Sequence, residues 1–330
     1  MKNVAIIGSG SWGVALGIHL AKLGNNVKIW SFEKSEADLI NNERKCKFLP
    51  NVTMPENIKC LLNYEDVIKD ADFILHVTPS KYTRNIVREY KKFVNPQKQP
   101  IIVCSKGLEQ STLSILTDVV KEEIPEARVG VLSGPSHAEE VSEGNFTLLV
   151  AASEDKELRE YIQDVFMSPT MRVYTSDDVI GVEYGAALKN IIAFCAGIAV
   201  ELNLGDNTVA ALLTRGLSEI ARLGVKVGAK KETFYGLSGL GDLIVTCNSE
   251  HSRNRKAGRL IGKGLQLDEV KKEVGMVIES VDNIEAAYEL KKRYGVEMPI
   301  VEEVYNVLYN GQNPRDSVYK LMQRDKKSES

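Results

Sequence analysis

The feature that most constrains the fold is a series of short apolar runs in the first half of the chain, separated by segments of helix length. The runs are rich in Val and Ile with little alternation, which is typical of strands buried on both faces of a parallel sheet. Alternating strands and helices predict a doubly wound α/β fold with right-handed crossovers. The predicted strands begin at Val4, Val27, Phe73, Ile101, Arg128 and Thr147. The predicted helices between them include residues 12–23, 81–93 and 111–123.

The second half of the chain has mainly helical spacing from residue 176 onward. Residues 182–202 form one long apolar segment, which predicts a helix buried on most sides. Further helices are predicted at residues 206–227, 252–263, 281–294 and 298–308. We therefore predict an α/β domain over residues 1–185 and an all-α domain over residues 186–330, bridged by the long helix with a cleft between them.

The composition argues against several classes of protein. Hydrophobic residues are 43% and charged residues 26% of 330, close to the average for soluble globular chains, so disorder and low-complexity assembly are poor interpretations. A formal net charge of -3 argues against a general nucleic-acid binder, which usually carries a large basic excess. No apolar run reaches the roughly 20 residues that span a bilayer, and no signal-peptide pattern is present. We expect neither a membrane nor a nucleic-acid partner.

The cysteine and histidine patterns argue against disulfides and metal sites. The five cysteines are far apart without a C-x-x-C pair, and the four histidines lack the spacing of zinc ligands. This usage suits a reducing compartment, so we expect a cytoplasmic protein without a bound metal. The cysteines are Cys46, Cys60, Cys104, Cys195 and Cys247.

A glycine motif lies between the first predicted strand and the helix that follows it. Gly8, Gly10 and Gly13 form a G-x-G-x-x-G pattern. In this context the first glycine permits a tight turn, the second lets the backbone approach a pyrophosphate, and the third lets helix and strand pack closely. The helix N-terminus then offers free N–H groups to the phosphates. The motif predicts a Rossmann-type domain that binds NAD or NADP.

The end of the second predicted strand bears on the choice between NAD and NADP. An acid here bonds the ribose 2′-hydroxyl, whereas a basic residue favours the 2′-phosphate. Glu33 favours NAD, but Ser31 and Lys34 could accommodate a phosphate. Glu33 is equally compatible with a surface residue at the start of the next helix, so the preference stays open.

Polar residues follow two further predicted strands, at the edge of the sheet where doubly wound folds bind ligands. Lys106 comes just after the strand at Ile101 and could direct its ammonium at an oxyanion, or it could be a solvated loop residue. Gly134 and Ser136 follow the next strand. Ser136 by itself is more typical of a helix cap.

Lys189 is the most informative single residue, because it lies inside the long apolar helix next to Asn190. A buried lysine is costly unless it is paired, and burial lowers its pKa toward neutrality, where it can exchange a proton. The alternative is a lysine whose long stem lets its ammonium reach the surface. Asp242, in a glycine-rich segment, could pair with Lys189 or could cap a short helix.

A basic cluster at a predicted helix start could hold a phosphate, because guanidinium groups and a helix N-terminus both bind anions. It could equally be a solvated helix face. Ser252 and Asn254 are polar neighbours, and Glu279 precedes the next helix. The cluster contains Arg253, Arg255, Lys256 and Arg259. We expect Lys106, Lys189, Arg253 and Arg255 to converge where an anionic substrate meets its cofactor.

Taken together, these motifs resemble the bacterial-type NAD(P)-dependent sn-glycerol-3-phosphate dehydrogenases. The resemblance covers most of the chain and implies reversible reduction of dihydroxyacetone phosphate to sn-glycerol 3-phosphate for phospholipid synthesis, by a cytoplasmic homodimer. The motifs are "GSGSWG", "KFLPNVTMPENI", "CSKGLE", "SGPSHAEEV", "EYGAALKNIIAFCAG", "GLSGLGDLIVTC", "HSRNRKAG" and "MVIESV".

The resemblance also implies roles for individual residues, with Lys189 as the catalytic general acid/base. The implied substrate residues are Lys106, Gly134, Ser136, Lys189, Asn190, Asp242, Thr246, Ser252, Arg253 and Asn254. The implied cofactor residues are Gly8, Gly10, Ser11, Trp12, Gly13, Phe32, Glu33, Phe48, Lys106, Ala138, Arg253, Val277 and Glu279. Three positions depart from the family pattern. Phe32 and Glu33 stand where the family commonly has an Arg or His, which weakens the case for an NADPH preference. Phe48 replaces a Tyr, which removes a hydroxyl near the cofactor.

Two other functions are compatible with parts of this pattern. One is another two-domain dehydrogenase acting on a 3-hydroxy acid or a sugar derivative, which would have less reason for the basic cluster. The other is a non-catalytic redox sensor, which would need the glycine loop but not Lys106, Lys189 and Asp242 together.

Overall fold

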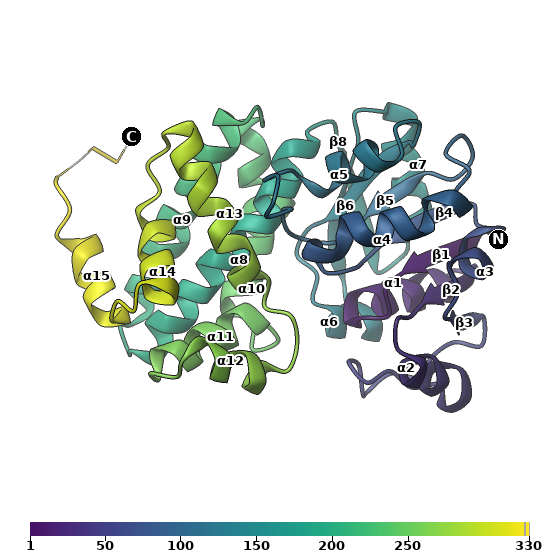
Figure 1. Cartoon of the computed structure of the whole chain (residues 1–330), viewed down its shortest axis with the longest axis horizontal. Helices are drawn as coiled ribbons and strands as arrows, with labels where there is room; N and C mark the ends of the chain where they lie inside the picture. Colours follow the sequence, from purple (N-terminus) through teal and green to yellow (C-terminus); the bar gives the residue numbers. More distant parts are fainter. Residues whose placement is uncertain (327, 330) are drawn as a thin grey trace.

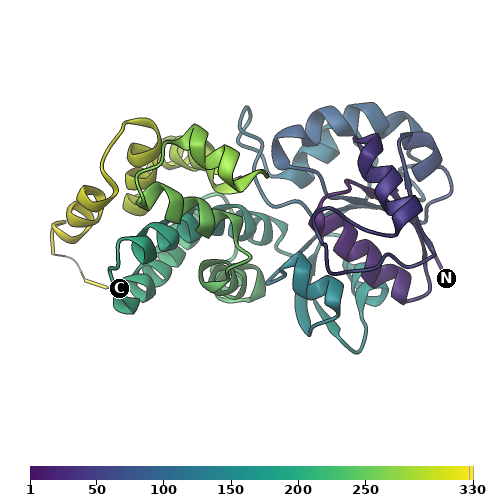
Figure 2. The same cartoon turned by 90° about the horizontal axis from the view of Figure 1, so that it is seen from below.

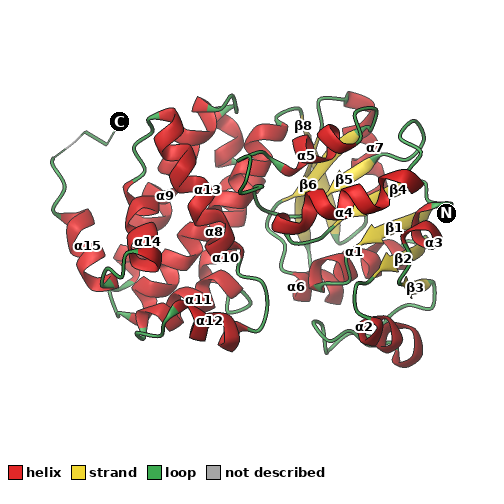
Figure 3. Ribbon diagram, in the orientation of Figure 1, coloured by secondary structure: helices red, strands yellow, loops and turns green. Residues whose placement is uncertain are grey.

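The protein is described from a computed structural model that covers residues 1–326, 328 and 329. It has two lobes, one built on a sheet and one built of helices (Figure 1). Every strand of the described residues belongs to the first lobe (Figure 3). The strands are β1 (Asn3–Ile7), β2 (Asn26–Trp30), β3 (Ile58–Leu61), β4 (Phe73–His76), β5 (Ile101–Val103), β6 (Val129–Ser133), β7 (Thr147–Ala152) and β8 (Met171–Ser176).

The sheet has the order β3-β2-β1-β4-β5-β6-β7-β8, and its neighbours are parallel except for β6 and β7. The order reverses between β1 and β4, so the crevice at the carboxyl ends of these strands is the expected ligand site. The predicted α/β class is confirmed. The all-parallel expectation is wrong for β7, and the edge strands β3 and β8 were missed because their side chains alternate between buried and exposed.

Helices cover both faces of the sheet. Predicted helix 81–93 consists of two 3₁₀ turns flanking α4 (Thr83–Tyr90), and predicted helix 111–123 begins only at Leu116. The segment before Leu116 is a loop, because Leu113 has φ of 65° and Leu108 pairs with Ile115 in an isolated bridge. The helices are α1 (Ser11–Lys22), α2 (Lys34–Asp38), α3 (Tyr64–Ile68), α4 (Thr83–Tyr90), α5 (Leu116–Glu123), α6 (Ala138–Glu143) and α7 (Lys156–Phe166).

The second lobe is helical and is centred on α8 (Val179–Glu201), which packs against four of the other helices of this lobe. An 18-residue window of α8 has a mean hydropathy of 1.4, enough to cross a membrane by length and composition, but 94% of that window is buried inside the protein. α8 is therefore a core helix, as its pattern predicted. The other helices are α9 (Asp206–Lys226), α10 (Asp242–Asn248), α11 (Arg253–Gly262), α12 (Leu267–Val274), α13 (Glu279–Tyr294), α14 (Pro299–Tyr309) and α15 (Pro314–Met322).

α8 also joins the two lobes, which lie side by side in a perpendicular view (Figure 2). It starts three residues after β8 ends, and its buried Glu183 accepts hydrogen bonds from the backbone N–H groups of Leu116 (2.9 Å) and Thr117 (3.2 Å) at the start of α5. A carboxylate at a helix N-terminus satisfies N–H groups that have no partner within the helix. This contact ties the sheet lobe to the helix. The exact domain boundary at residue 185 remains a prediction.

Close glycine contacts fix how α11 crosses α8. A Cβ added to Gly258 would lie 1.9 Å from the carbonyl oxygen of Phe194, and one added to Gly197 would lie 2.1 Å from that of Arg255. Any larger residue would push the helices apart. The crossing therefore holds the N-terminus of α11 beside the middle of α8, where Asn190 lies.

Candidate active site

The glycine loop lies between β1 and α1 and has the shape of a phosphate cradle. Gly8 has φ of +127°, and a Cβ on it would lie 2.5 Å from the carbonyl oxygen of Val77. A Cβ on Gly13 would lie 2.2 Å from the carbonyl oxygen of Gly8, whereas one on Gly10 would meet nothing within 4 Å. The loop is thus closed on the protein side and open at Gly10. The opening lies at Gly10, where the motif predicts that the backbone approaches a pyrophosphate.

The first turn of α1 faces the same opening. Gly10 is its N-cap and supplies no side-chain cap, so the first N–H groups of the helix are left for a ligand. Ser11 and Trp12 are the first two residues of α1 and are half-buried. The Trp12 Nε1 atom is buried and has no hydrogen-bond partner among the described residues. An orphaned donor beside the cradle is consistent with a bound dinucleotide.

The end of β2 differs from what the sequence suggested. Phe32 is 81% exposed, and Glu33 is an exposed residue at the N-cap position of α2 whose side chain caps nothing. Instead, Glu36 reaches back to the glycine loop and accepts hydrogen bonds from Ser9 Oγ (2.5 Å) and Ser31 Oγ (3.1 Å). Sequence reasoning missed Glu36. Its position in the sequence could have indicated this role, because Glu36 lies one helical turn after Glu33.

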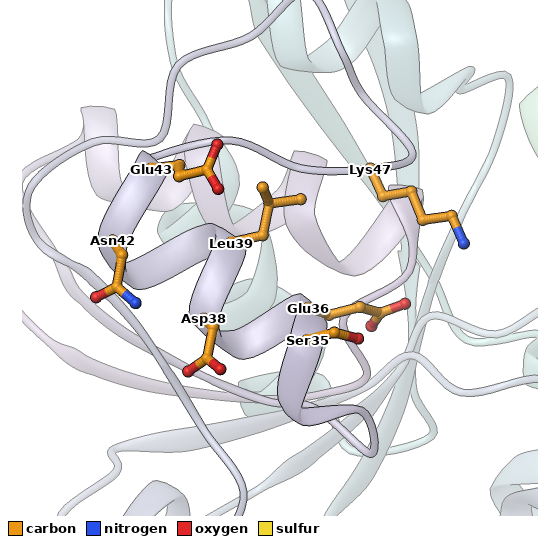
Figure 4. Close-up of a pocket in the computed structure, with 7 residues that line it drawn as sticks. All are labelled: Ser35, Glu36, Asp38, Leu39, Asn42, Glu43 and Lys47. Atoms are coloured by element: carbon orange, nitrogen blue, oxygen red, sulfur yellow. The ribbon is translucent and has the colours of Figure 1, made fainter.

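A hollow of about 350 Å³ is lined by residues of α2, of the turn after it and by Lys47 (Figure 4). Phe48, a predicted cofactor residue, is next in sequence to Lys47, which lines the hollow. The Phe48 side chain is half-buried and packs against the core of the sheet lobe. The hollow is lined by Ser35, Glu36, Asp38, Leu39, Asn42, Glu43 and Lys47.

The loops after β5 and β6 meet at Lys106. Its Nζ donates to the carbonyl oxygen of Gly134 (3.0 Å) and to Ser136 Oγ (3.4 Å). Ser136 Oγ in turn donates to the Gly134 carbonyl (2.9 Å). The cap interpretation of Ser136 is wrong, because the N-cap of α6 is His137 and Ser136 uses its hydroxyl within the loop. Ala138 is the first residue of α6.

The central feature is a carboxylate shared by two lysines. Asp242 Oδ1 accepts from Lys189 Nζ (2.5 Å), and Asp242 Oδ2 accepts from Lys106 Nζ (2.8 Å). Lys189 also donates to Thr246 Oγ1 (2.6 Å), one turn further along α10. Lys189 is only 5% exposed and Asp242 only 1%. Lys189 is therefore buried and paired, and its ammonium does not reach the surface. Asp242 pairs with Lys189 and does not cap α10, because the N-cap of α10 is Gly241.

Burial and charge shift the pKa values at this centre. Burial, together with the neighbouring positive charge of Lys106, lowers the pKa of Lys189 to about 8 against the opposing effect of Asp242. Burial alone would raise the pKa of Asp242, but the two ammonium groups lower it below its ordinary value. Asp242 is thus a carboxylate near neutral pH, while Lys189 titrates there and can donate or accept a proton.

A second set of polar side chains comes from α11 and α13. Asn254 Nδ2 donates to Asn190 Oδ1 (3.0 Å), and Asn254 Oδ1 accepts from the backbone N–H of Ser280 (2.9 Å). Ser252 caps α11 by accepting from the N–H of Arg255 (3.2 Å). These contacts lock the start of α11 against Asn190, the residue next to Lys189.

Arg253 is the first residue of α11, and its guanidinium pairs with Glu279 Oε1 (2.7 Å) at the start of α13. Glu279 is close enough to raise the pKa of Lys189, and Val277 lies two residues before it, half-buried. Arg255 does not join this group. Its guanidinium pairs with Glu250 (2.5 Å), so the expected convergence of Arg255 is not observed.

His137 is a neighbour that sequence reasoning passed over. Burial lowers the pKa of His137, and the positive charges of Lys189 and Lys106 lower it further. Its ring lies 5.9 Å from that of His251. The only signal in the sequence was its position beside Ser136. Within the described residues, no group of three or more His, Cys, Asp or Glu side chains could hold a metal ion.

A nucleotide cradle in one lobe and a buried lysine–carboxylate–lysine centre at the lobe junction define a two-domain, dinucleotide-dependent dehydrogenase. Residues 3–159 match the family described as NAD-dependent glycerol-3-phosphate dehydrogenase N-terminus, and residues 178–319 match the corresponding C-terminus. The chain belongs to the NAD-dependent glycerol-3-phosphate dehydrogenase family. The predicted family and enzyme class are therefore confirmed, whereas the roles of individual site residues stay predictions.

Relatives along the whole chain agree. Glycerol-3-phosphate dehydrogenase (NAD(P)+) of Fusobacterium nucleatum is 50% identical over 100% of this chain and 99% of its own length, and that of Clostridium acetobutylicum is 49% identical with the same coverage. The solved glycerol-3-phosphate dehydrogenase of Coxiella burnetii is 35% identical, has a TM-score of 0.95, and aligns over 98% of this chain and 99% of its own. A ketopantoate reductase from Ralstonia eutropha, 15% identical with a TM-score of 0.61, shares the fold alone.

Proposed function

We propose that the protein catalyses reversible hydride transfer between NAD(P)H and dihydroxyacetone phosphate, giving sn-glycerol 3-phosphate for glycerophospholipid synthesis. The observation that carries this proposal is the buried pairing of Asp242 with Lys189 and Lys106 at the lobe junction. It provides a proton donor of suitable pKa and positive charge where a carbonyl oxygen would become negative. Residues 1–185 would hold the nucleotide, and residues 186–330 would complete the substrate site.

Lys189 acts as the general acid in ketone reduction. The bound nicotinamide supplies the hydride to the ketone carbon. Protonated Lys189 neutralises the charge that grows on the carbonyl oxygen and gives that oxygen its proton. In the oxidation direction, neutral Lys189 takes the hydroxyl proton. A pKa of about 8 makes both forms accessible near neutral pH.

Asp242 and Thr246 hold the Lys189 ammonium in place through contacts of 2.5 Å and 2.6 Å. Asp242 also holds Lys106, which adds positive charge beside the carbonyl oxygen. Because both lysines are fixed by one buried carboxylate, little reorganisation is needed as charge develops.

The phosphate of the substrate binds at the start of α11. Arg253 and Asn254 supply a guanidinium and an amide there, on a helix terminus that itself attracts anions. Binding energy from the phosphate, remote from the reacting carbon, positions that carbon against Lys189. This phosphate site separates the proposal from dehydrogenases that act on unphosphorylated 3-hydroxy acids.

The test is a spectrophotometric assay with dihydroxyacetone phosphate and either NADH or NADPH, with unphosphorylated dihydroxyacetone as the matched control. We expect oxidation of at least one cofactor with the phosphorylated ketone and much weaker activity with the control. No oxidation of either cofactor by well-folded protein that binds nucleotide would overturn the substrate assignment.

We further propose a homodimer in the cytoplasm. The five cysteines, all free and buried, support a reducing compartment. Light scattering after size-exclusion chromatography measures the mass, and a monomeric mass at micromolar concentration would contradict the dimer.

A further inference from the structure

Glu36 occupies a specific place at the cofactor end of the sheet. Its carboxylate bridges the glycine loop and the end of β2, because Oε2 accepts from both Ser9 Oγ (2.5 Å) and Ser31 Oγ (3.1 Å). The two hydroxyls also lie 2.9 Å apart. Ser9 and Ser31 are both buried, so this contact is an ordered part of the loop rather than a surface pairing.

This place is where an adenosine ribose lies in a dinucleotide-binding fold. The ribose sits between the first turn of the glycine motif and the end of the second strand, and its 2′-hydroxyl bonds an acid there. In this chain the acid at the strand end, Glu33, is exposed, and its carboxylate has no contact with the glycine loop among the described hydrogen bonds. Glu36 is the carboxylate that faces the loop, and it can accept ribose hydroxyls in place of the serine hydroxyls.

The charges around Glu36 also favour a ribose with a free 2′-hydroxyl over one that carries a 2′-phosphate. The hollow beside Glu36 is lined by three carboxylates and one ammonium within the described residues (Figure 4). A 2′-phosphate adds nearly two negative charges, and like charges a few ångströms apart repel strongly when partly shielded from water. The charged lining residues are Glu36, Asp38, Glu43 and Lys47.

We propose that Glu36 selects NADH over NADPH, by accepting the adenosine ribose hydroxyls and repelling the 2′-phosphate. This proposal rests on one part of the proposed function, which is that the cofactor is a nicotinamide dinucleotide. It assigns the discriminating acid to the first turn of α2 instead of the strand end.

The test measures dissociation constants for NADH and NADPH by isothermal titration calorimetry without any substrate. We expect the wild-type protein to bind NADH at least tenfold more tightly than NADPH. Glu36→Gln keeps the size but removes the charge, and we expect it to reduce this ratio about tenfold, mainly through tighter NADPH binding. Glu33→Gln, a matched acid one helical turn away, is expected to leave the ratio within twofold.

Three outcomes would overturn the proposal: a wild-type preference for NADPH, an unchanged ratio in Glu36→Gln, or a loss of discrimination in Glu33→Gln instead. Thermal unfolding followed by circular dichroism shows whether each variant is folded, and the wild-type ratio tests the proposal even if Glu36→Gln does not fold. Failure of the proposed function looks different, because protein that binds NADH but does not turn over dihydroxyacetone phosphate leaves this ratio intact.

Discussion

The two parts of the candidate active site are built on opposite principles. The nucleotide cradle comes from six consecutive positions, Gly8 to Gly13. Its shape depends on glycines, because they have no Cβ atom to fill the space. The lysine centre draws Lys106, Lys189 and Asp242 from segments up to 136 residues apart and depends on buried charges that compensate each other. The cradle therefore depends on steric fit, whereas the lysine centre depends on electrostatics.

This difference predicts how each part fails. The three glycines of the cradle should be sensitive to an added methyl group, because their role is steric. The lysine centre should be sensitive to loss of one charge, because that loss leaves its buried partners uncompensated. Substitutions that separate these effects test the comparison.

The largest effect is expected for Lys189→Ala. Removal of a positioned general acid typically lowers kcat by about 10²- to 10⁴-fold. Because Lys189 lies in the helical lobe and the cradle in the sheet lobe, we expect the dissociation constant for NADH to change by less than about threefold. Steady-state kinetics and calorimetry measure the two quantities. A kcat close to wild type would remove Lys189 from the mechanism.

The cradle is tested by two matched glycine substitutions. A methyl at Gly10 meets no protein atom within 4 Å, so Gly10→Ala should fold normally and weaken nucleotide binding only by filling the opening. A methyl at Gly13 would collide with the Gly8 carbonyl, so Gly13→Ala should lose stability as well. Overpacking costs about 1–3 kcal/mol, which corresponds to roughly 5- to 150-fold in Kd.

Calorimetry and thermal melts separate the two variants. We expect Gly10→Ala to melt within about 2 °C of wild type and Gly13→Ala to melt several degrees lower. Equal melting temperatures with equal affinities would show that the loop is not a phosphate cradle.

The same contrast explains what could be predicted from the sequence. The cradle was predictable because the motif is local and each glycine has a steric reason. Burial of Lys189 was favoured because apolar residues surround it at helical spacing, but the pattern left open that its ammonium reaches the surface. The pairing of Asp242 with Lys189 could only be left open, since 53 residues separate them, and the direct contact of Lys106 with Asp242 was not foreseen.

The wrong or missed predictions share a physical cause: tertiary contacts hold these side chains in places that the local sequence pattern does not indicate. Ser136 has the residue type of a helix cap, but Lys106 and the Gly134 carbonyl lie within reach of its hydroxyl. Arg255 belongs to the basic cluster by sequence, but its position on α11 directs it to Glu250. Glu36 was missed because its importance depends on reaching back to the glycine loop from a neighbouring helix.

The phosphate end of the lysine centre is tested by Arg253→Ala. Loss of a charged hydrogen bond costs about 1.5–3 kcal/mol, so we expect the KM for dihydroxyacetone phosphate to rise by about 10- to 100-fold. Arg259→Ala is the matched control, because Arg259 lies on the same helix and pairs with Glu201. We expect its KM to change by less than about twofold. Equal KM values in the two variants would mean that α11 presents only a solvated basic face.

The smallest effect is the pH dependence of the wild-type enzyme, and its sign follows from Lys189. Burial lowers its pKa to about 8, so the protonated form needed for ketone reduction is abundant below pH 8 and is lost above it. kcat/KM for dihydroxyacetone phosphate should therefore fall about tenfold per pH unit above 8, since this quantity reports the free enzyme. Oxidation of sn-glycerol 3-phosphate needs the neutral form, so its kcat/KM should rise through the same pKa. Because the cradle binds through backbone N–H groups, the dissociation constant for NADH should stay constant over this range. Parallel pH profiles in both directions would contradict the assignment, since a single acid/base must give opposite slopes.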